Sequence, residues 1–219
     1  MKIIPSLLDA PRDWKEMKAQ LEPLIAKRLI SSVHLDPADG KLVHNYTLDW
    51  LNPELVKKLK HAFPQLKVAV HLMTQNPENY AEQFIRAGTD RIWFHIDAKK
   101  NNKKLAHLRK KYKKVEFGPV VNPETNENKL KQMQFTCVLI MTIHPGKGGQ
   151  RLLKYMLKKV KRIKRAYPTA TVAVDGGVHL DNIASVANAG VDEAVCGTAV
   201  FKGNAVKNVL KLKKSTRTV

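Results

Sequence analysis

Cysteine is scarce in this sequence: only Cys137 and Cys196 occur among its 219 residues. Both lie in apolar stretches, where a cysteine is usually a reduced thiol packed in a core. Two such residues cannot supply the disulfide framework that stabilises many small secreted domains. We therefore expect a cytoplasmic protein that is stabilised by a large hydrophobic core.

Long hydrophobic runs are also missing. No apolar stretch approaches the roughly 20 residues that a membrane helix needs. The first residues, Met1 to Ser6, have no apolar region typical of a signal peptide and instead predict a first strand. We expect no membrane partner.

Acidic residues are few, with 19 Asp and Glu against 39 Lys and Arg, which gives a formal net charge of +20. Such a surplus can attract nucleic acid without specificity. In residues 152–167, however, Leu153, Met156, Val160 and Ile163 recur at helical spacing between basic residues, which predicts an amphipathic helix with a solvated basic face. Aromatic residues make up only 6% of the chain, too few for a base-stacking surface. We favour a basic enzyme surface over nucleic-acid binding and expect no specific nucleic-acid partner.

Strand-like and helix-like patterns alternate along the whole chain. The predicted strands cover 2–6, 30–36, 67–71, 91–95, 114–120, 135–142, 171–175 and 193–197. The predicted helices cover 13–28, 53–63, 77–87, 103–112, 124–132, 151–167, 180–189 and 205–213. Eight such pairs without a linker predict one domain, residues 1–219, folded as an α/β protein of the (β/α)8 TIM-barrel type. An open doubly wound sheet is the alternative.

Capping residues support several of these boundaries. Asn52 and Asn76 are expected N-caps, each followed by a proline in the first helical turn. Gly88 and Gly190 follow two predicted helices, as glycines that end helices do.

Polar residues gather at the carboxyl ends of the predicted strands, where barrel enzymes place their chemistry. Alternation puts His34 and Asp36 on one face of their strand, while His71 and Asp175 end two others. Imidazole and carboxylate groups in a barrel mouth are costly to bury unless they are paired or bind metal. This set predicts one divalent metal ion, with Zn, Fe, Mn and Co all suitable.

Three glycine-rich segments follow strands six, seven and eight. They are residues 145–150, Gly176-Gly177 and Gly197-Thr198. Glycines let backbone N–H groups approach an anion closely, and barrels commonly bind phosphate after strands seven and eight. Neither a P-loop nor a dinucleotide-binding fingerprint is present. We therefore predict a phosphate group on the ligand.

The motifs in these segments resemble those of the ribulose-phosphate 3-epimerase family along nearly the whole chain. They are Ile4-Pro5-Ser6-Leu7-Leu8, Val33-His34-Leu35-Asp36-Pro37-Ala38-Asp39-Gly40, Val70-His71-Leu72-Met73, Ile140 to Gln150, Val174-Asp175-Gly176-Gly177-Val178, and Ala189-Gly190 to Phe201. The resemblance implies a ribulose-phosphate-binding barrel. Its implied reaction is the metal-dependent interconversion of D-ribulose 5-phosphate and D-xylulose 5-phosphate by epimerisation at carbon 3.

The resemblance also implies residue roles. His34, Asp36, His71 and Asp175 resemble the metal ligands of the family. Asp36 resembles its proton acceptor and Asp175 its proton donor on the opposite face of the substrate. The remaining substrate-binding positions implied are Ser6, His71, Met73, Met141, Gly146, Lys147, Gly148, Gly149, Asp175, Gly176, Gly177, Gly197 and Thr198. The expected partners are a phosphorylated ketose and further copies of the chain in a homo-oligomer.

The chain departs from the family pattern at a few positions. Ala38 stands where a third methionine is usual, and residues 9–11 read Asp-Ala-Pro instead of Ser-Ala-Asp. His144, Lys147 and Thr198 replace a usual asparagine, phenylalanine and serine. The smaller Ala38 leaves open a ketohexose phosphate such as D-allulose 6-phosphate. A related barrel decarboxylase or aldolase fits less well, because the lysine of its Asp-x-Lys-x-x-Asp motif is absent.

Overall fold

The computed structural model describes residues 1–146 and 149–216. Its strands are β1 (Lys2–Pro5), β2 (Ser32–Leu35), β3 (Lys67–Leu72), β4 (Arg91–His95), β5 (Glu116–Val121), β6 (Cys137–Met141), β7 (Thr171–Asp175) and β8 (Glu193–Cys196). Its α-helices are α1 (Trp14–Ala26), α2 (Pro53–Ala62), α3 (Glu78–Arg86), α4 (Asn102–Lys111), α5 (Met156–Ala166), α6 (Ile183–Asn188), α7 (Thr198–Phe201) and α8 (Ala205–Ser215). Two 3₁₀ helices, η1 (Leu7–Asp9) and η2 (Glu127–Gln132), follow β1 and β5.

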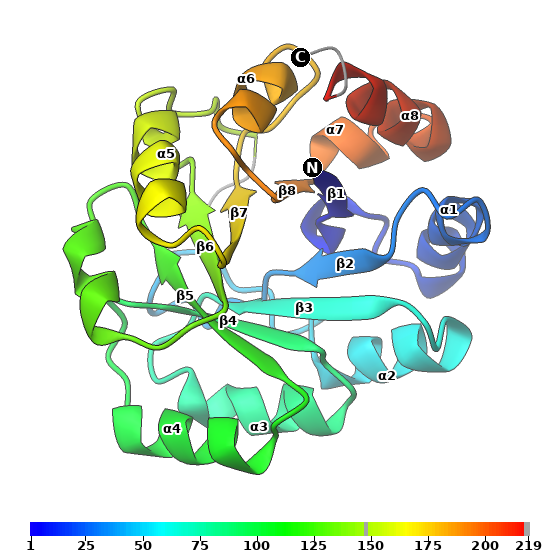
Figure 1. Ribbon diagram of the computed structural model, residues 1–219. Helices are drawn as coiled ribbons and strands as arrows, with labels where there is room; N and C mark the ends of the chain where they lie inside the picture. The colour runs from blue at the N-terminus through cyan, green and yellow to red at the C-terminus, as the bar shows by residue number, and fades with distance from the viewer. Residues whose placement is uncertain (147–148, 217–219) are drawn as a thin grey trace.

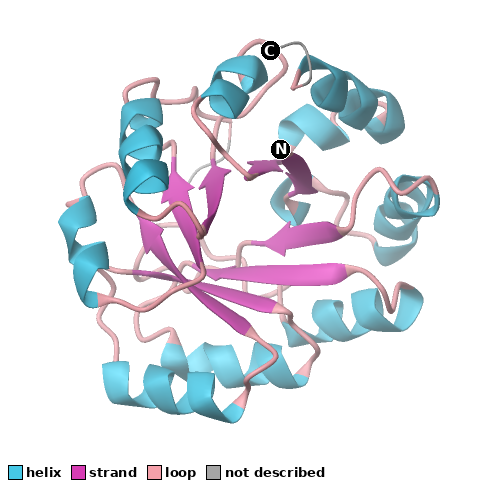
Figure 2. Ribbon diagram, in the orientation of Figure 1, coloured by secondary structure: helices cyan, strands magenta, loops and turns pink. Residues whose placement is uncertain are grey.

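The strands form one parallel sheet in the order β1-β8-β7-β6-β5-β4-β3-β2. A parallel bridge between Ser6 and His34 joins β1 to β2 and brings the two edges of the sheet together. Helices surround this ring of strands on its outside (Figures 1 and 2). The predicted (β/α)8 barrel is confirmed, and the open doubly wound sheet is not observed.

Side chains along each strand point alternately toward the surrounding helices and into the barrel. Val33 and Leu35 of β2 and Val172 and Val174 of β7 belong to the large core between the strands and the helices. The intervening residues point into the barrel, where ten buried residues, Trp93 among them, form a second apolar cluster. His34, His71 and Asp175 have this inward parity, so the local strand geometry directs them into the barrel.

The chain departs from the predicted helices after β5 and β6. Residues 124–132 were expected to be helical, but only η2 forms there, as a 3₁₀ helix. Residues 151–155 were expected to begin a helix, but α5 begins at Met156. The backbone N–H of Leu153 instead donates to the carbonyl of Thr142, 2.8 Å away, so this segment lies against the carboxyl end of β6.

The capping predictions hold at one helix and fail at another. Asn52 caps α2 by accepting from the N–H of Leu55, with Pro53 in the first turn. Asn76 does not cap α3, whose N-cap position is Pro77. The N–H of Asn76 donates to the carbonyl of Lys99, which accompanies its unusual positive φ of 56°. Gly88 and Gly190 both have positive φ after their helices, as predicted.

The basic helix α5 has its apolar stripe inward, with Met156, Val160 and Ile163 buried. Lys159 contradicts the prediction of a wholly solvated basic face, because its side chain is buried. Its ammonium group donates to the carbonyls of Pro123 and Thr125, 2.8 Å from each. This lysine holds the β5–η2 loop against the barrel. In the described part of the chain, no helix is long and apolar enough to cross a membrane.

Candidate active site

Three strands bring two imidazoles and two carboxylates together inside the barrel mouth. The Nε2 atom of His34 and the Nδ1 atom of His71 lie 3.0 Å and 3.1 Å from Oδ1 of Asp36. Oδ2 of Asp175 lies 3.4 Å from His71 Nδ1 and 3.8 Å from His34 Nε2. One donor atom from each of the four residues lies within 4.8 Å of the others. The predicted ligand set therefore forms one compact cluster with its donor atoms facing a common centre.

Neighbouring hydroxyl groups fix the position of Asp36. The hydroxyl of Ser6 donates to Oδ2 of Asp36 at 2.7 Å, which leaves Oδ1 for the two imidazoles. Thr47 donates to the backbone carbonyl of Asp36 at 2.7 Å and accepts from the N–H of Ala38 at 2.8 Å. Because each partner is buried, these bonds hold the carboxylate in one orientation.

The electrostatics of the cluster favour a positive charge at its centre. Burial would raise the pKa of Asp36, but the charge of His34 and hydrogen bonds from His34 and His71 outweigh it and hold this pKa well below its usual value of 3.8. Burial would lower the pKa of His71, but hydrogen bonds to Asp175 and Asp36 raise it to about 9. The two carboxylates thus stabilise a cation between them. Two imidazoles and two carboxylates around a positive centre fit a divalent metal of the predicted kind.

His95 lies directly behind His71, with their Nε2 atoms 2.8 Å apart and their rings stacked. Burial and then the charge of His71 lower the pKa of His95 well below its usual value, so His95 is a neutral imidazole. Its buried Nδ1 atom and the buried Oδ1 atom of Asn122 have no hydrogen bond of normal geometry among the described residues. Asn122, Asp97 and Asp36 favour a proton on His95, but burial and the charge of His71 outweigh them. A neutral His95 accepts from His71 Nε2–H and leaves Nδ1 of His71 directed at the centre of the cluster.

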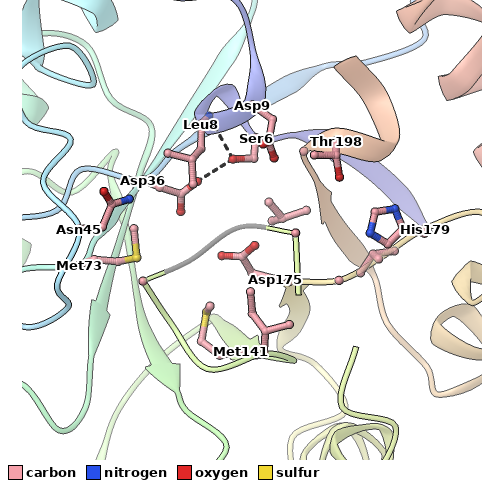
Figure 3. Close-up of a pocket in the computed structure, with 18 residues that line it drawn as sticks. Ser6, Leu8, Asp9, Asp36, Asn45, Met73, Met141, Asp175, His179 and Thr198 are labelled. Atoms are coloured by element: carbon pink, nitrogen blue, oxygen red, sulfur yellow. Dashed lines mark hydrogen bonds between the residues drawn. The ribbon is translucent and has the colours of Figure 1, made fainter. Parts of the chain in front are cut away.

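A pocket opens above the cluster at the carboxyl ends of the strands (Figure 3). In this view, Met73 and Met141 lie on one side of the two carboxylates, and Thr198 and His179 lie on the other. Of the predicted substrate-binding residues, the ones lining it are Ser6, Met73, Met141, Gly146, Gly149, Asp175, Gly176, Gly177, Gly197 and Thr198. His71 is fully buried beneath the pocket. Lys147 and Gly148 lie outside the described residues.

Two of the glycines lie very close to other groups. Gly177 has φ +66°, and a side chain there would collide with the backbone of Leu152 and Gln150. A side chain at Gly197 would collide with the carboxylate of Asp9. Only glycine lets the backbone at position 177 approach the 150–152 segment so closely, whereas at Gly197 the neighbour is the end of a side chain.

Of the departures from the family pattern, Asp9 and Thr198 line the pocket, whereas Ala38 and His144 lie outside its lining. Ala38 is buried against Val43 and Met73. Ala38 is fully buried there and does not line the pocket. His144 is exposed and pairs with Glu124 at 2.7 Å.

Some pocket residues were not expected from the sequence. Asn45 reaches the pocket from the long β2–α2 connection, and His179 from the β7–α6 connection. No spacing signal marks these loop residues. Asp9 could have been found, because it follows Ser6 in the same turn, where a polar residue stays near the mouth.

The family model described as "Ribulose-phosphate 3 epimerase family" matches residues 2–201. The chain belongs to this family. The ribulose-phosphate 3-epimerase of Schizosaccharomyces pombe is 31% identical over 213 residues, covering 95% of this chain and 90% of that protein. The ribulose-phosphate 3-epimerase of Helicobacter pylori strain 26695 is 33% identical over 208 residues, covering 92% and 91%. Membership agrees with the resemblance inferred from the motifs.

Solved structures with low identity share the barrel fold. The 3-hexulose-6-phosphate synthase of Salmonella typhimurium superposes with a TM-score of 0.74 at 12% identity, covering 99% of both chains. KGPDC from Streptococcus mutans in complex with D-R5P superposes with a TM-score of 0.72 at 14% identity, covering 98% of this chain and 96% of that one. At such identity the likeness supports the fold alone.

Proposed function

We propose that the protein interconverts D-ribulose 5-phosphate and D-xylulose 5-phosphate by epimerisation at carbon 3. The observation that carries this proposal is the convergence of His34, Asp36, His71 and Asp175 at the floor of a glycine-lined pocket in a member of this family. The pocket has carboxylates for proton transfer at its floor and backbone amides suited to a phosphate at one end.

The reaction needs a proton to leave carbon 3, next to the carbonyl at carbon 2. A divalent metal held by the four residues would act as a Lewis acid and stabilise the negative charge that develops on the substrate oxygens. Asp36 is ionised at neutral pH because its pKa is held low, so it is in the form that can accept a proton. Ser6 keeps the second oxygen of Asp36 occupied and so limits rotation of the carboxylate.

Inversion requires the new proton to arrive from the other face of carbon 3. Asp175 ends β7 while Asp36 follows β2, so the two carboxylates reach the pocket from different parts of the barrel wall. We assign proton removal to Asp36 and proton delivery to Asp175. Gly146, Gly149, Gly176, Gly177, Gly197 and Thr198 form the proposed phosphate end and orient the substrate, whose two methionine neighbours, Met73 and Met141, cover its apolar face.

Isotope exchange tests this assignment. In heavy water, D-xylulose 5-phosphate made by the wild-type protein should carry solvent deuterium at carbon 3. An Asp175→Asn variant with wild-type metal content should still exchange the carbon 3 hydrogen of the substrate, while forming product at least about a hundredfold more slowly. An Asp36→Asn variant of equal metal content should do neither.

Mass spectrometry and NMR of the recovered sugar phosphates give the readout, and metal content is measured in each preparation. Product that keeps its original hydrogen would contradict the two-base assignment. A parallel assay with D-allulose 6-phosphate decides between pentose and hexose phosphates. Faster turnover of the hexose would contradict the proposed substrate.

A further inference from the structure

The phosphate end of the pocket contains a carboxylate of its own. Asp9 ends η1 and lines the pocket together with Gly197 and Thr198 (Figure 3). It approaches the chain so closely that a side chain at Gly197 would collide with its Oδ2 atom. The carboxylate therefore fills the space that a side chain at Gly197 would take.

Asp9 also lies beside a donor suited to the proposed phosphate. Asp9 and Thr198 line the same end of the pocket, and the backbone N–H of Thr198 favours the ionised form of Asp9 and lowers its pKa. Enclosure by the pocket wall raises the pKa of Asp9, and the charges of Asp36 and Asp175 raise it further, whereas His179 lowers it. The Asp9 carboxylate thus lies near the Thr198 amide in the free protein, although the charges of Asp36 and Asp175 repel it.

We propose that Asp9 is a specificity-determining residue that competes with phosphate for the Thr198 amide. This inference rests on the proposed function, because it places the substrate phosphate at the Gly197–Thr198 end of the pocket. Two anions cannot share one N–H donor in a small pocket, since their charges repel. The substrate phosphate displaces the Asp9 carboxylate when it binds.

The displacement favours complete substrates over small anions. Asp9 is exposed, so its carboxylate has room to turn toward water. A sugar phosphate is also held at the carboxylate floor of the pocket, and this second attachment offsets the cost of moving Asp9. Inorganic phosphate has no second attachment, so the same cost leaves it with little affinity, whereas the sugar phosphate still binds.

Substitution of Asp9 by serine or asparagine tests the competition. Serine is too short to reach the amide, and asparagine keeps the shape without the charge. In both variants we expect the Kd of inorganic phosphate, measured by isothermal titration calorimetry on metal-replete protein, to fall about tenfold. We expect KM for D-ribulose 5-phosphate to fall by about threefold with kcat within twofold of wild type.

Asp13→Asn is the matched control, because it removes the same charge only four residues away. Asp13 is the N-cap of α1, exposed, and outside the pocket lining, and asparagine caps helices as well as aspartate does. This control should leave both constants at their wild-type values.

The inference is overturned if the Asp9 variants bind inorganic phosphate no more tightly than wild type, or if no variant binds it at all. A rise in KM would also overturn it, since Asp9 would then hold the substrate instead of opposing its phosphate. Because the phosphate titration needs no turnover, it decides the role of Asp9 even if the protein fails to epimerise any ketose phosphate. That second failure would contradict the proposed function alone.

Discussion

At the scale of single residues, the orientation of a predicted metal ligand depends on the residue behind it. His71 offers Nδ1 to the cluster only if its other nitrogen has a fixed partner, and His95 is that partner at 2.8 Å. Second partners of this kind orient the ring and set its tautomer. His95 is thus a positioning residue that touches neither the pocket nor the cluster centre.

Replacing His95 should weaken metal binding. In the His95→Ala variant we expect the Kd of Co²⁺, measured by competition with a chromophoric chelator, to rise about 10- to 100-fold. The visible spectrum of bound Co²⁺ should change as well, because its intensity depends on ligand geometry. His95→Gln, whose amide oxygen can accept from His71, should recover part of the affinity. Equal Co²⁺ affinity in His95→Ala and wild type would show that His71 needs no such partner.

The residues that could be predicted from the sequence are those that end strands. His34, His71 and Asp175 converge because alternation and the parallel arrangement of strands decide both their direction and their height in the barrel. Asp9 and Thr198 lie far apart in the sequence, and no periodic pattern links them. Only the folded barrel shows that they are neighbours. His95 ends β4 and Asn122 follows β5, so the sequence places both near the mouth, but the contact between His95 and His71 is visible only in the folded barrel.

At the scale of elements, local preference explains most helices, and long-range contacts explain the exceptions. Asn76 has the chemistry of an N-cap, but its N–H pairs with the carbonyl of Lys99 in another loop. From helical spacing alone, Lys159 would lie at the edge of the basic face of α5, next to the buried Val160. It turns inward because the chain after β5 leaves backbone carbonyls without helical partners, and the ammonium group satisfies them.

Lys159→Met should therefore destabilise the barrel although it adds apolar surface to a buried site. Removing the ammonium leaves buried carbonyls unsatisfied, and we expect the free energy of unfolding to fall by about 2–3 kcal/mol. Lys158→Met is the matched control, because Lys158 is exposed on the same helix, and it should change stability by less than about 0.5 kcal/mol. Urea unfolding followed by circular dichroism measures both. Equal stability of the two variants would contradict the anchoring role of Lys159.

At the scale of the whole molecule, the positive charge should be separable from the reaction. Lys158, Lys161 and Arg165 are exposed on α5, on the outside of the barrel. Lys164 is less suitable for a charge-reversal test, because it pairs with Asp192 at 2.6 Å.

Reversing Lys158, Lys161 and Arg165 to glutamate should leave epimerase activity within about twofold of wild type, since no substrate contact is removed. Nonspecific binding to duplex DNA, measured by fluorescence anisotropy at low salt, should weaken about tenfold or more. Lys158→Arg with Lys161→Arg keeps the charge and should change neither quantity. A collapse of activity in the folded triple variant would mean that this face takes part in the function.

The proposed metal ligands are spaced unevenly along the chain: His34, Asp36 and His71 come early, and Asp175 comes in the seventh strand. During synthesis, a ribosome releases the first three long before the fourth, and β8 must still emerge before it can pair with β1. The full ligand set therefore exists only in the nearly finished barrel. The first steps of folding would therefore proceed without the ion. An ion that binds only the folded state stabilises that state by mass action. Metal supply in the cell would thus govern how long the finished enzyme survives.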